Sequence, residues 1–229
     1  PNDNAGDPVI IIGPKDLTFR TDLASTASGK GAALVGFKKS GTGATSRDVE
    51  GKFQDTVSVF DFIPKEQITN ILAGTSTFDA TAYIQNAIDT GKSLYFPGSR
   101  AKALYFFTHL TMPDGQVWYG DGPYSSVLRQ LATVDADEPA ITITGLNSGN
   151  IADNPRIWSN IGLEIKSKVA VHASNCTASL MRSNNLRIQN QHSETLGAPP
   201  YTVVAGSKAF EFDGTSASIF LSKHTNIEI

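Results

Sequence analysis

The stretch VAVHASNCTASLMRSNNLRI, residues 169–188, decides the fold, because it aligns without gaps on FEFDGTSASIFLSKHTNIEI, residues 210–229. The matched positions are Val169 with Phe210, Val171 with Phe212, Leu180 with Leu221, Arg182 with Lys223, Asn185 with Asn226, and Leu186-x-Ile188 with Ile227-x-Ile229. A longer copy opens with ITIT at 141–144 and closes with LEI at 163–165. The alternative, chance self-similarity, is disfavoured by the repeated Asn-apolar-x-apolar ending. Three copies with loop-sized insertions indicate a solenoid.

Each copy contains short strands of alternating polarity, separated by Gly, Asn and Ser, with no helical period. About 20 to 25 residues per coil suits a parallel β-helix, whose alternate apolar side chains point inward and stack on the next coil. Residues 189–209 would then form a loop between strands. We therefore predict an all-β fold, a right-handed single-stranded parallel β-helix.

The preceding residues predict how such a solenoid starts. A run from Val57 to Phe62, ended by Pro64, indicates a short strand. Residues 79–89 indicate the one substantial helix, with Asp79 as N-cap and Gly91 as the stop signal. The first coil of a solenoid needs a cover, which this helix would provide. Short strands are expected at 93–96, 104–107, 116–119 and 126–130.

Composition divides the chain and excludes several classes of protein. Residues 1–55 hold few large apolar residues, so we expect an extended neck or linker, followed at 56–229 by the N-terminal part of a longer β-helix. A net charge of −3 offers no basic surface for nucleic acid, and one cysteine excludes an internal disulfide framework. Apolar runs are too short to predict membrane insertion.

Four segments in order resemble the opening of the pectate-lyase-like β-helix of bacteriophage tailspikes. They are TVSVFDFI at 56–63, DATAYIQNAID at 79–89, LYFPG at 94–98, and VWYGDGP at 117–123 followed by SVL at 126–128. Residues 19–25 and 34–36 resemble the neck that precedes such domains. One departure is that IPKEQITNILAG, residues 63–74, replaces the usual glycine- and aspartate-rich stretch.

The resemblance implies a homotrimer in the virion tail. It also implies contact with other tail or baseplate proteins through the N-terminal side, and attachment to bacterial surface polysaccharide, which the complete protein would depolymerise as a hydrolase or lyase. Two alternatives stay open. One is a structural or adhesive tail protein that positions a receptor-binding region, and the other is a polysaccharide-degrading enzyme outside a virion.

Candidate site residues follow from the alternation. Glu211 and Asp213 alternate with phenylalanines and should share an outward face about 7 Å apart. That separation suits the two carboxylates of an inverting glycosidase, although outward strand positions are commonly polar without being catalytic. His172 aligns with Asp213 in the repeat and could contact a sugar.

A second outward column contains Glu164, Arg187 and Glu228, for which a structural ion-pair ladder is the preferred interpretation. The aromatic residues that could stack on sugar faces are Tyr119, Tyr124, Trp158 and Tyr201. Aromatic residues inside strand patterns, Trp118 above all, are expected in the core or at a trimer contact. P-loop, dinucleotide-binding, EF-hand and nucleophile-elbow motifs are lacking, so we expect no cofactor and no metal.

Overall fold

A computed structural model describes residues 14–113, 115–144, 156–174, 181–190, 208–213 and 223–228. The chain divides into two compact units, Pro1–Asp55 and Thr56–Ile229. Each unit is described below by itself.

The first unit consists of short helices and one hairpin. Its elements are α1 (Pro14–Leu23), the 3-10 helix η1 (Gly31–Leu34), the antiparallel strands β1 (Gly36–Phe37) and β2 (Arg47–Asp48), and α2 (Val49–Phe53). Asp48 caps α2 by accepting a hydrogen bond from the Gly51 N–H. Among its described residues, only Gly31 is buried, so the segment predicted as a neck builds no core of its own.

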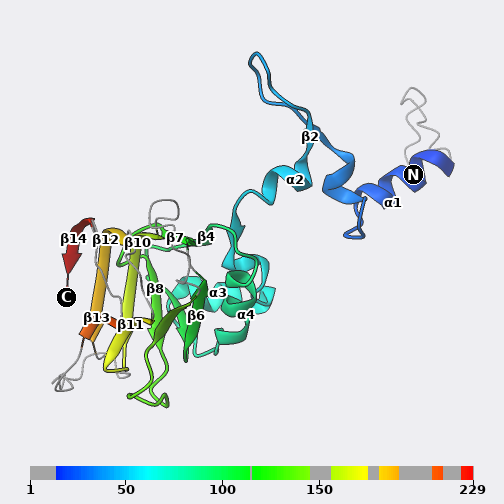
Figure 1. Cartoon of the computed structure of the whole chain (residues 1–229). Coiled ribbons are helices and arrows are strands. Elements are labelled where there is room, and N and C mark those ends of the chain that lie inside the picture. The colour runs from blue at the N-terminus through cyan, green and yellow to red at the C-terminus, as the bar shows by residue number, and fades with distance from the viewer. Residues whose placement is uncertain are drawn as a thin grey trace. The chain divides into compact units, whose positions relative to one another are not determined.

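The second unit is mostly β (Figure 1). The strands of its described residues pair in parallel and form three rows. The first row contains β3 (Val57–Ser58), β4 (Leu94–Phe96), β7 (Val117–Gly120), and the N-terminal parts of β10 (Arg156–Ile165), β12 (Met181–Asn190) and β14 (Lys223–Glu228). The second contains β5 (Ala103–Phe107), β8 (Ser126–Gln130) and the C-terminal parts of β10, β12 and β14. The third contains β6 (Leu110–Pro113), β9 (Ile141–Thr144), β11 (Val169–Ser174) and β13 (Lys208–Asp213).

The chain passes through the rows in the same order from one coil to the next, which places equivalent side chains in columns. Tyr105, Leu128, Leu163 and Ile188 form one inward column of register partners. Their side chains are almost fully buried and belong to one core shared by all three rows. Over the described residues the sheets curl strongly around this core without closing into a complete β-helix.

Two asparagines turn the chain from the first row to the second. Asn160 in β10 and Asn185 in β12 have φ values of 55° and 54°, a conformation that Asn tolerates better than most residues. The Asn185 side-chain amide donates to Asn160 Oδ1 at 2.9 Å. The asparagine that the repeat aligns, at 185 and 226, is therefore a corner residue at position 185.

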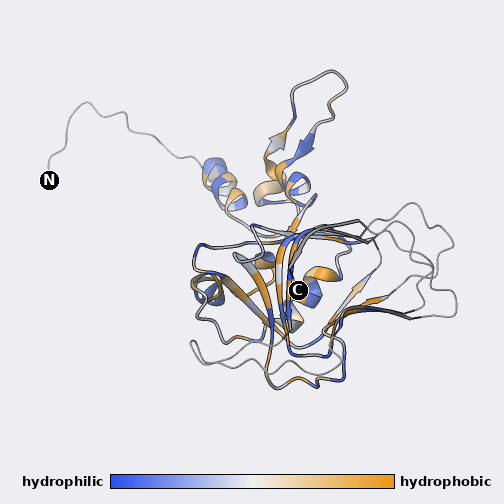
Figure 2. Ribbon diagram, turned by 90° about the vertical axis from the view of Figure 1, so that its left-hand side faces the viewer, coloured by the Kyte–Doolittle hydropathy of each residue, from blue (hydrophilic) through white to orange (hydrophobic). Residues whose placement is uncertain are grey.

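Helices lie at the β3–β6 end of the rows, where α3 (Lys65–Ala73) contacts β5 and α4 (Thr81–Ile88) contacts β6 (Figure 1). Ile84, Ala87 and Ile88 of α4 are fully buried in the common core. Figure 2 shows hydrophobic residues in both the helices and the strands of this unit.

The helices correct the sequence predictions for residues 63–89. The expectation of a single substantial helix was wrong: Ile68, Ile71 and Leu72 carry the helical spacing of α3, and Gly74 ends it with φ 71°. The helix predicted at 79–89 spans Thr81–Ile88, and its N-cap is Ala80, so the prediction of Asp79 as N-cap was wrong by one residue. The Asp79 side chain still accepts the Thr81 N–H at 2.9 Å.

The strand predicted from Val57 to Phe62 is also shorter than expected. It ends at Ser58, and the 3-10 helix η2 (Val59–Asp61) follows because Ser58 and Asp61 form a capping box.

Candidate functional site

The outward face of the second row carries a buried carboxylate. Alternation along β10 directs Leu163 inward and Glu164 outward, in a column where Phe106, Arg129, Glu164 and Gln189 are register partners. Glu164 is nevertheless only 1% exposed. A buried charge is costly unless it is paired, so its partners define the site.

Three cations converge on Glu164. Lys102 Nζ lies 2.5 Å from Glu164 Oε1, and Arg187 Nη1 lies 3.1 Å from the same oxygen. Arg129 binds the other oxygen with two nitrogens, Nε at 2.6 Å and Nη2 at 2.5 Å. These four residues come from four successive coils, so one carboxylate joins the turn before β5 to strands β8, β10 and β12.

The cations set the ionisation of the carboxylate. Burial alone would raise the pKa of Glu164, but the hydrogen bond from Lys102 and the positive charges of Arg129, Lys102 and Arg187 outweigh burial. Together they lower the pKa from 4.5 to about 2. Glu164 is therefore ionised at neutral pH.

The turn between β7 and β8 packs over this face. Gly162 permits the close approach, because a Cβ there would lie 2.1 Å from the backbone oxygen of Pro123. Tyr124 follows in the turn and is 56% exposed, and the Arg187 guanidinium lies 4.8 Å from the centre of its ring. The turn thus adds an aromatic ring to the rim of the charged cluster.

Arg129 and Lys102 complete the rim. The Arg129 guanidinium lies 5.8 Å from the centre of the Phe106 ring, a distance consistent with a cation–π contact. Lys102 lies in the turn before β5 with φ 70° and reaches across to Glu164. We call Lys102, Tyr124, Arg129, Glu164 and Arg187 the Glu164 cluster.

The predicted ion-pair column is present with a different register. Arg187 is the register partner of Gly162 in β10 and of Glu228 in β14, whereas the register partner of Glu164 is Gln189. The repeat alignment, which placed Glu164 opposite Arg187, was therefore wrong by two residues. The ion pair still forms, because a two-residue shift keeps both side chains on the same face. The Glu228 side chain lies outside the described residues.

In the third row, too, the register of the predicted catalytic residues differs from the repeat alignment. His172 is the register partner of Glu211, and Asp213 is the partner of Ser174. The alignment of His172 with Asp213 was therefore also wrong by two residues. Glu211 is half-buried and forms an ion pair with Lys208, whereas the Asp213 side chain lies outside the described residues. The structure thus places His172 beside Glu211, one of the two predicted carboxylates.

The predicted sugar-stacking residues have different outcomes. Trp158 is 1% exposed and stacks on Trp118 with ring centres 5.3 Å apart, so its indole faces the core and cannot contact a ligand at the surface. The reason is strand alternation, which directs Trp158 inward beside the outward Ser159. Tyr201 lies outside the described residues. Trp118 is fully buried, as expected of a core residue.

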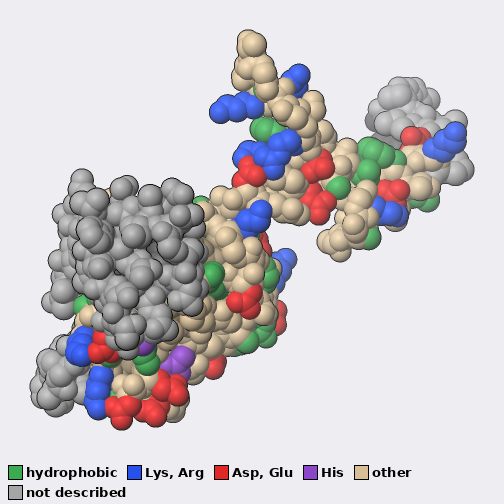
Figure 3. Space-filling model, viewed as in Figure 1, with side chains coloured by type: hydrophobic (Ala, Val, Ile, Leu, Met, Phe, Trp, Pro, Cys, Tyr) green, Lys and Arg blue, Asp and Glu red, His purple; other side chains and the backbone are tan. Residues whose placement is uncertain are grey.

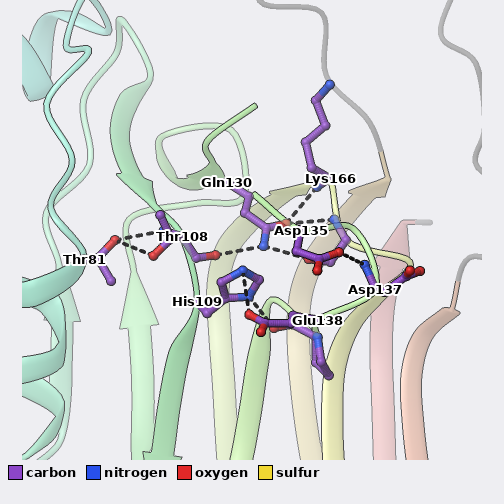
Figure 4. Close-up of polar contacts among 10 residues, drawn as sticks. Thr81, Thr108, His109, Gln130, Asp135, Asp137, Glu138 and Lys166 are labelled. Carbon is purple, nitrogen blue, oxygen red and sulfur yellow. Dashed lines mark hydrogen bonds and ion pairs between the residues drawn. The ribbon is translucent and has the colours of Figure 1, made fainter. Parts of the chain in front are cut away.

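A second polar group lies around the turn from β8 to β9 (Figure 4). Gln130 is fully buried, donates to the Thr108 backbone oxygen at 2.8 Å, and accepts from the backbone N–H groups of Lys166 and Ser167. It therefore bridges three coils, and its bonds are those of a structural residue.

Two acidic residues of the same turn lie beside basic side chains. His109 Nε2 lies 3.3 Å from Glu138, and Lys168 forms an ion pair with Asp137. Figure 3 shows acidic, basic and histidine side chains gathered at one edge of this unit. Among the described side chains, no group of three or more His, Cys, Asp or Glu residues could hold a metal ion.

Sequence reasoning identified Glu164 and Arg187 as a charged column and Tyr124 as a candidate sugar-stacking residue, but missed Lys102 and Arg129. Arg129 carried a usable signal, since it is a charged outward residue in a predicted strand. Lys102 lies in a turn, where polar residues are common and no period marks them.

Comparison with known proteins identifies a structural neighbour. No protein-family model matches the sequence, and no curated protein does either. The structure is similar to the crystal structure of tailspike protein 3 of bacteriophage CBA120, with a TM-score of 0.53 and 19% sequence identity. The match covers 76% of this chain and 28% of the tailspike chain.

None of the described helices is long and apolar enough to cross a membrane.

Proposed function

We propose that this chain is part of a phage tail spike that attaches the virion to a polysaccharide on the bacterial surface. The observation that supports the proposal is the fold, which matches a tailspike over 76% of the chain. The sequence resemblance to tailspike openings rests on separate evidence, since it uses motif order rather than coordinates. At 19% identity, the likeness concerns the fold, and the attachment role is our inference from it.

The proposal includes the complete fold. Strands that pass through three parallel rows in a constant order are the coils of a parallel β-helix, and a right-handed path is the usual one for parallel crossovers. Helices α3 and α4 would cap its first coil, because α4 buries Ile84 and Ile88 in the core that the coil would otherwise expose.

We further propose a homotrimer that contacts other tail or baseplate proteins through its N-terminal unit. Exposed apolar side chains support this assembly. Leu17 is 63% exposed, Phe19 58% and Phe53 74%, and these residues would be covered by neighbouring chains or tail proteins.

Degradation of the polysaccharide by the complete protein is the finer form of the proposal. His172 and Glu211 are adjacent outward residues of the third row and are the side chains to test for it. The non-enzymatic alternative, an adhesive spike, shares the attachment step and lacks only cleavage.

The test of attachment is binding of the purified chain to an array of bacterial capsular and O-polysaccharides. We expect saturable binding to at least one polysaccharide, and binding to none would overturn the proposal. Incubation of the complete protein with the bound polysaccharide then measures oligosaccharide release. Release that is lost in Glu211→Gln would support cleavage, and no release would support the adhesive alternative.

A further inference from the structure

We infer that the Glu164 cluster binds an anionic group of an acidic polysaccharide, such as the carboxylate of a uronic or sialic acid residue. This inference rests on the proposed attachment function and specifies the chemistry of its ligand. It concerns the second row, away from the residues that the sequence suggested for catalysis.

The first argument is charge. The Glu164 carboxylate is contacted by three cations, so the described side chains of the cluster carry a positive excess. Glu228 lies opposite Arg187 in the register, and cations still outnumber carboxylates when it is counted. By contrast, the ion pairs Lys168–Asp137 and Lys208–Glu211 of the third row match one cation to one carboxylate.

The second argument is hydrogen-bonding capacity. One carboxylate offers about four acceptor positions, whereas two guanidinium groups and one ammonium carry many more N–H donors. Arg187 uses one nitrogen on Glu164 and another on the Gln189 side chain. Glu164 therefore holds the cations in place without using all their N–H donors. An additional anion would accept hydrogen bonds from the donors that Glu164 does not use.

The third argument is access and order. The cation side chains retain partial exposure, 33% for Lys102, 17% for Arg129 and 13% for Arg187, so solvent reaches them. Their shared carboxylate and the rings of Phe106 and Tyr124 fix their positions. Binding then costs little side-chain ordering, which favours affinity.

The fourth argument is the neighbouring aromatic ring. Tyr124 is 56% exposed on the same face, beside Arg187. An aromatic side chain presents a large, rigid apolar surface with a polar end. A cationic cluster next to such a ring suits an acidic sugar, whose carboxylate would meet the cations while its apolar face lies on tyrosine.

The experiment measures affinity on a polysaccharide array that includes polysialic acid, polygalacturonate, hyaluronate, acidic bacterial capsules and neutral dextran. We expect the bound glycans to be acidic and their affinity to fall as sodium chloride rises, because the attraction is electrostatic. Lys102→Met should weaken binding about tenfold, the effect of losing one charge-assisted hydrogen bond. Lys168→Met is the matched control, since it removes another ion-paired lysine outside the cluster, and it should bind as wild type.

Tyr124→Ala tests the same face with a residue whose exposure makes misfolding a minor concern, and it should also weaken binding several-fold. Circular dichroism must show each variant folded. Binding of neutral glycans alone would overturn this inference and leave the attachment function standing, whereas binding of no glycan would overturn both. Acidic-glycan binding that both variants retain at wild-type strength would also overturn it, since the site would then lie elsewhere.

Discussion

Replacing Glu164 by glutamine leaves three cations around a neutral side chain that is almost completely buried. The wild-type carboxylate has its pKa lowered from 4.5 to about 2 by these cations. At ~1.4 kcal/mol per pKa unit, the shift corresponds to about 3 kcal/mol of stabilisation. Loss of one partner from a buried ion pair costs a similar amount, about 3 to 5 kcal/mol. We therefore expect Glu164→Gln to lower the free energy of unfolding by about 3 kcal/mol at neutral pH.

The pH dependence follows from the direction of the shift. Folding lowers the pKa of Glu164, so the stabilisation is complete above pH about 4.5 and is lost as the pH falls from there toward about 2. Glu164→Gln cannot titrate at this position. The difference in unfolding free energy between wild type and variant should be constant near neutrality and shrink through that acidic window.

Urea unfolding followed by circular dichroism at a series of pH values measures both quantities. Asp137→Asn is the control, because that side chain is 74% exposed and its ion pair with Lys168 should contribute too little to resolve. A loss in Glu164→Gln below about 0.5 kcal/mol at pH 7, typical of an ordinary surface substitution, would refute the reasoning. So would a difference that does not change with pH.

Three further substitutions test the packing of the coils by thermal or urea unfolding. Trp118→Phe should lower the free energy of unfolding by about 1 to 2 kcal/mol more than Trp158→Phe does. The reason is that Trp118 Nε1 donates to the buried Gln116 side chain, whereas Trp158 Nε1 has no hydrogen-bond partner among the described residues. Equal losses in the two variants would contradict this prediction. Gly162→Ala should lower the free energy of unfolding by about 1 to 3 kcal/mol, because the added Cβ would overlap the Pro123 carbonyl oxygen 2.1 Å away. An unchanged unfolding midpoint would contradict this close approach. Asn185→Ala should cost at least about 1 kcal/mol because its φ is 54°, and Asn185→Gly should be less destabilising if backbone conformation is the cause.

The strands of the parallel rows and their inward faces could be predicted from the sequence, because the evidence for them lies within each strand. Strand alternation repeats every two residues, so Val171 and Ala173 can be assigned to the core and His172 to the surface without knowledge of neighbouring coils. The Asn185 corner and the pairing of Arg182 with Lys223 follow from the same repeat, and the structure has both. The evidence for helix α3 is equally local, since its apolar spacing and the Gly74 stop signal lie within residues 65–74.

The register between coils could be decided only by the tertiary structure. From Val171 to Arg182 the chain advances 11 residues, whereas their register partners Phe210 and Lys223 are 13 residues apart, so a gapless alignment misplaces one row by two. Such a shift is invisible in the polarity pattern, because moving a strand by two residues returns every side chain to the same face.

The Glu164 cluster depends on this register and on two turns. Lys102 and Tyr124 come from turns before and after β strands, and they meet Glu164 and Arg187 only because the coils stack. The sequence by itself determined which residues face inward and which face outward, since that choice is made within each strand. The tertiary structure alone decided which outward charges become neighbours, since turn lengths and coil stacking fix the distances between strands remote in sequence.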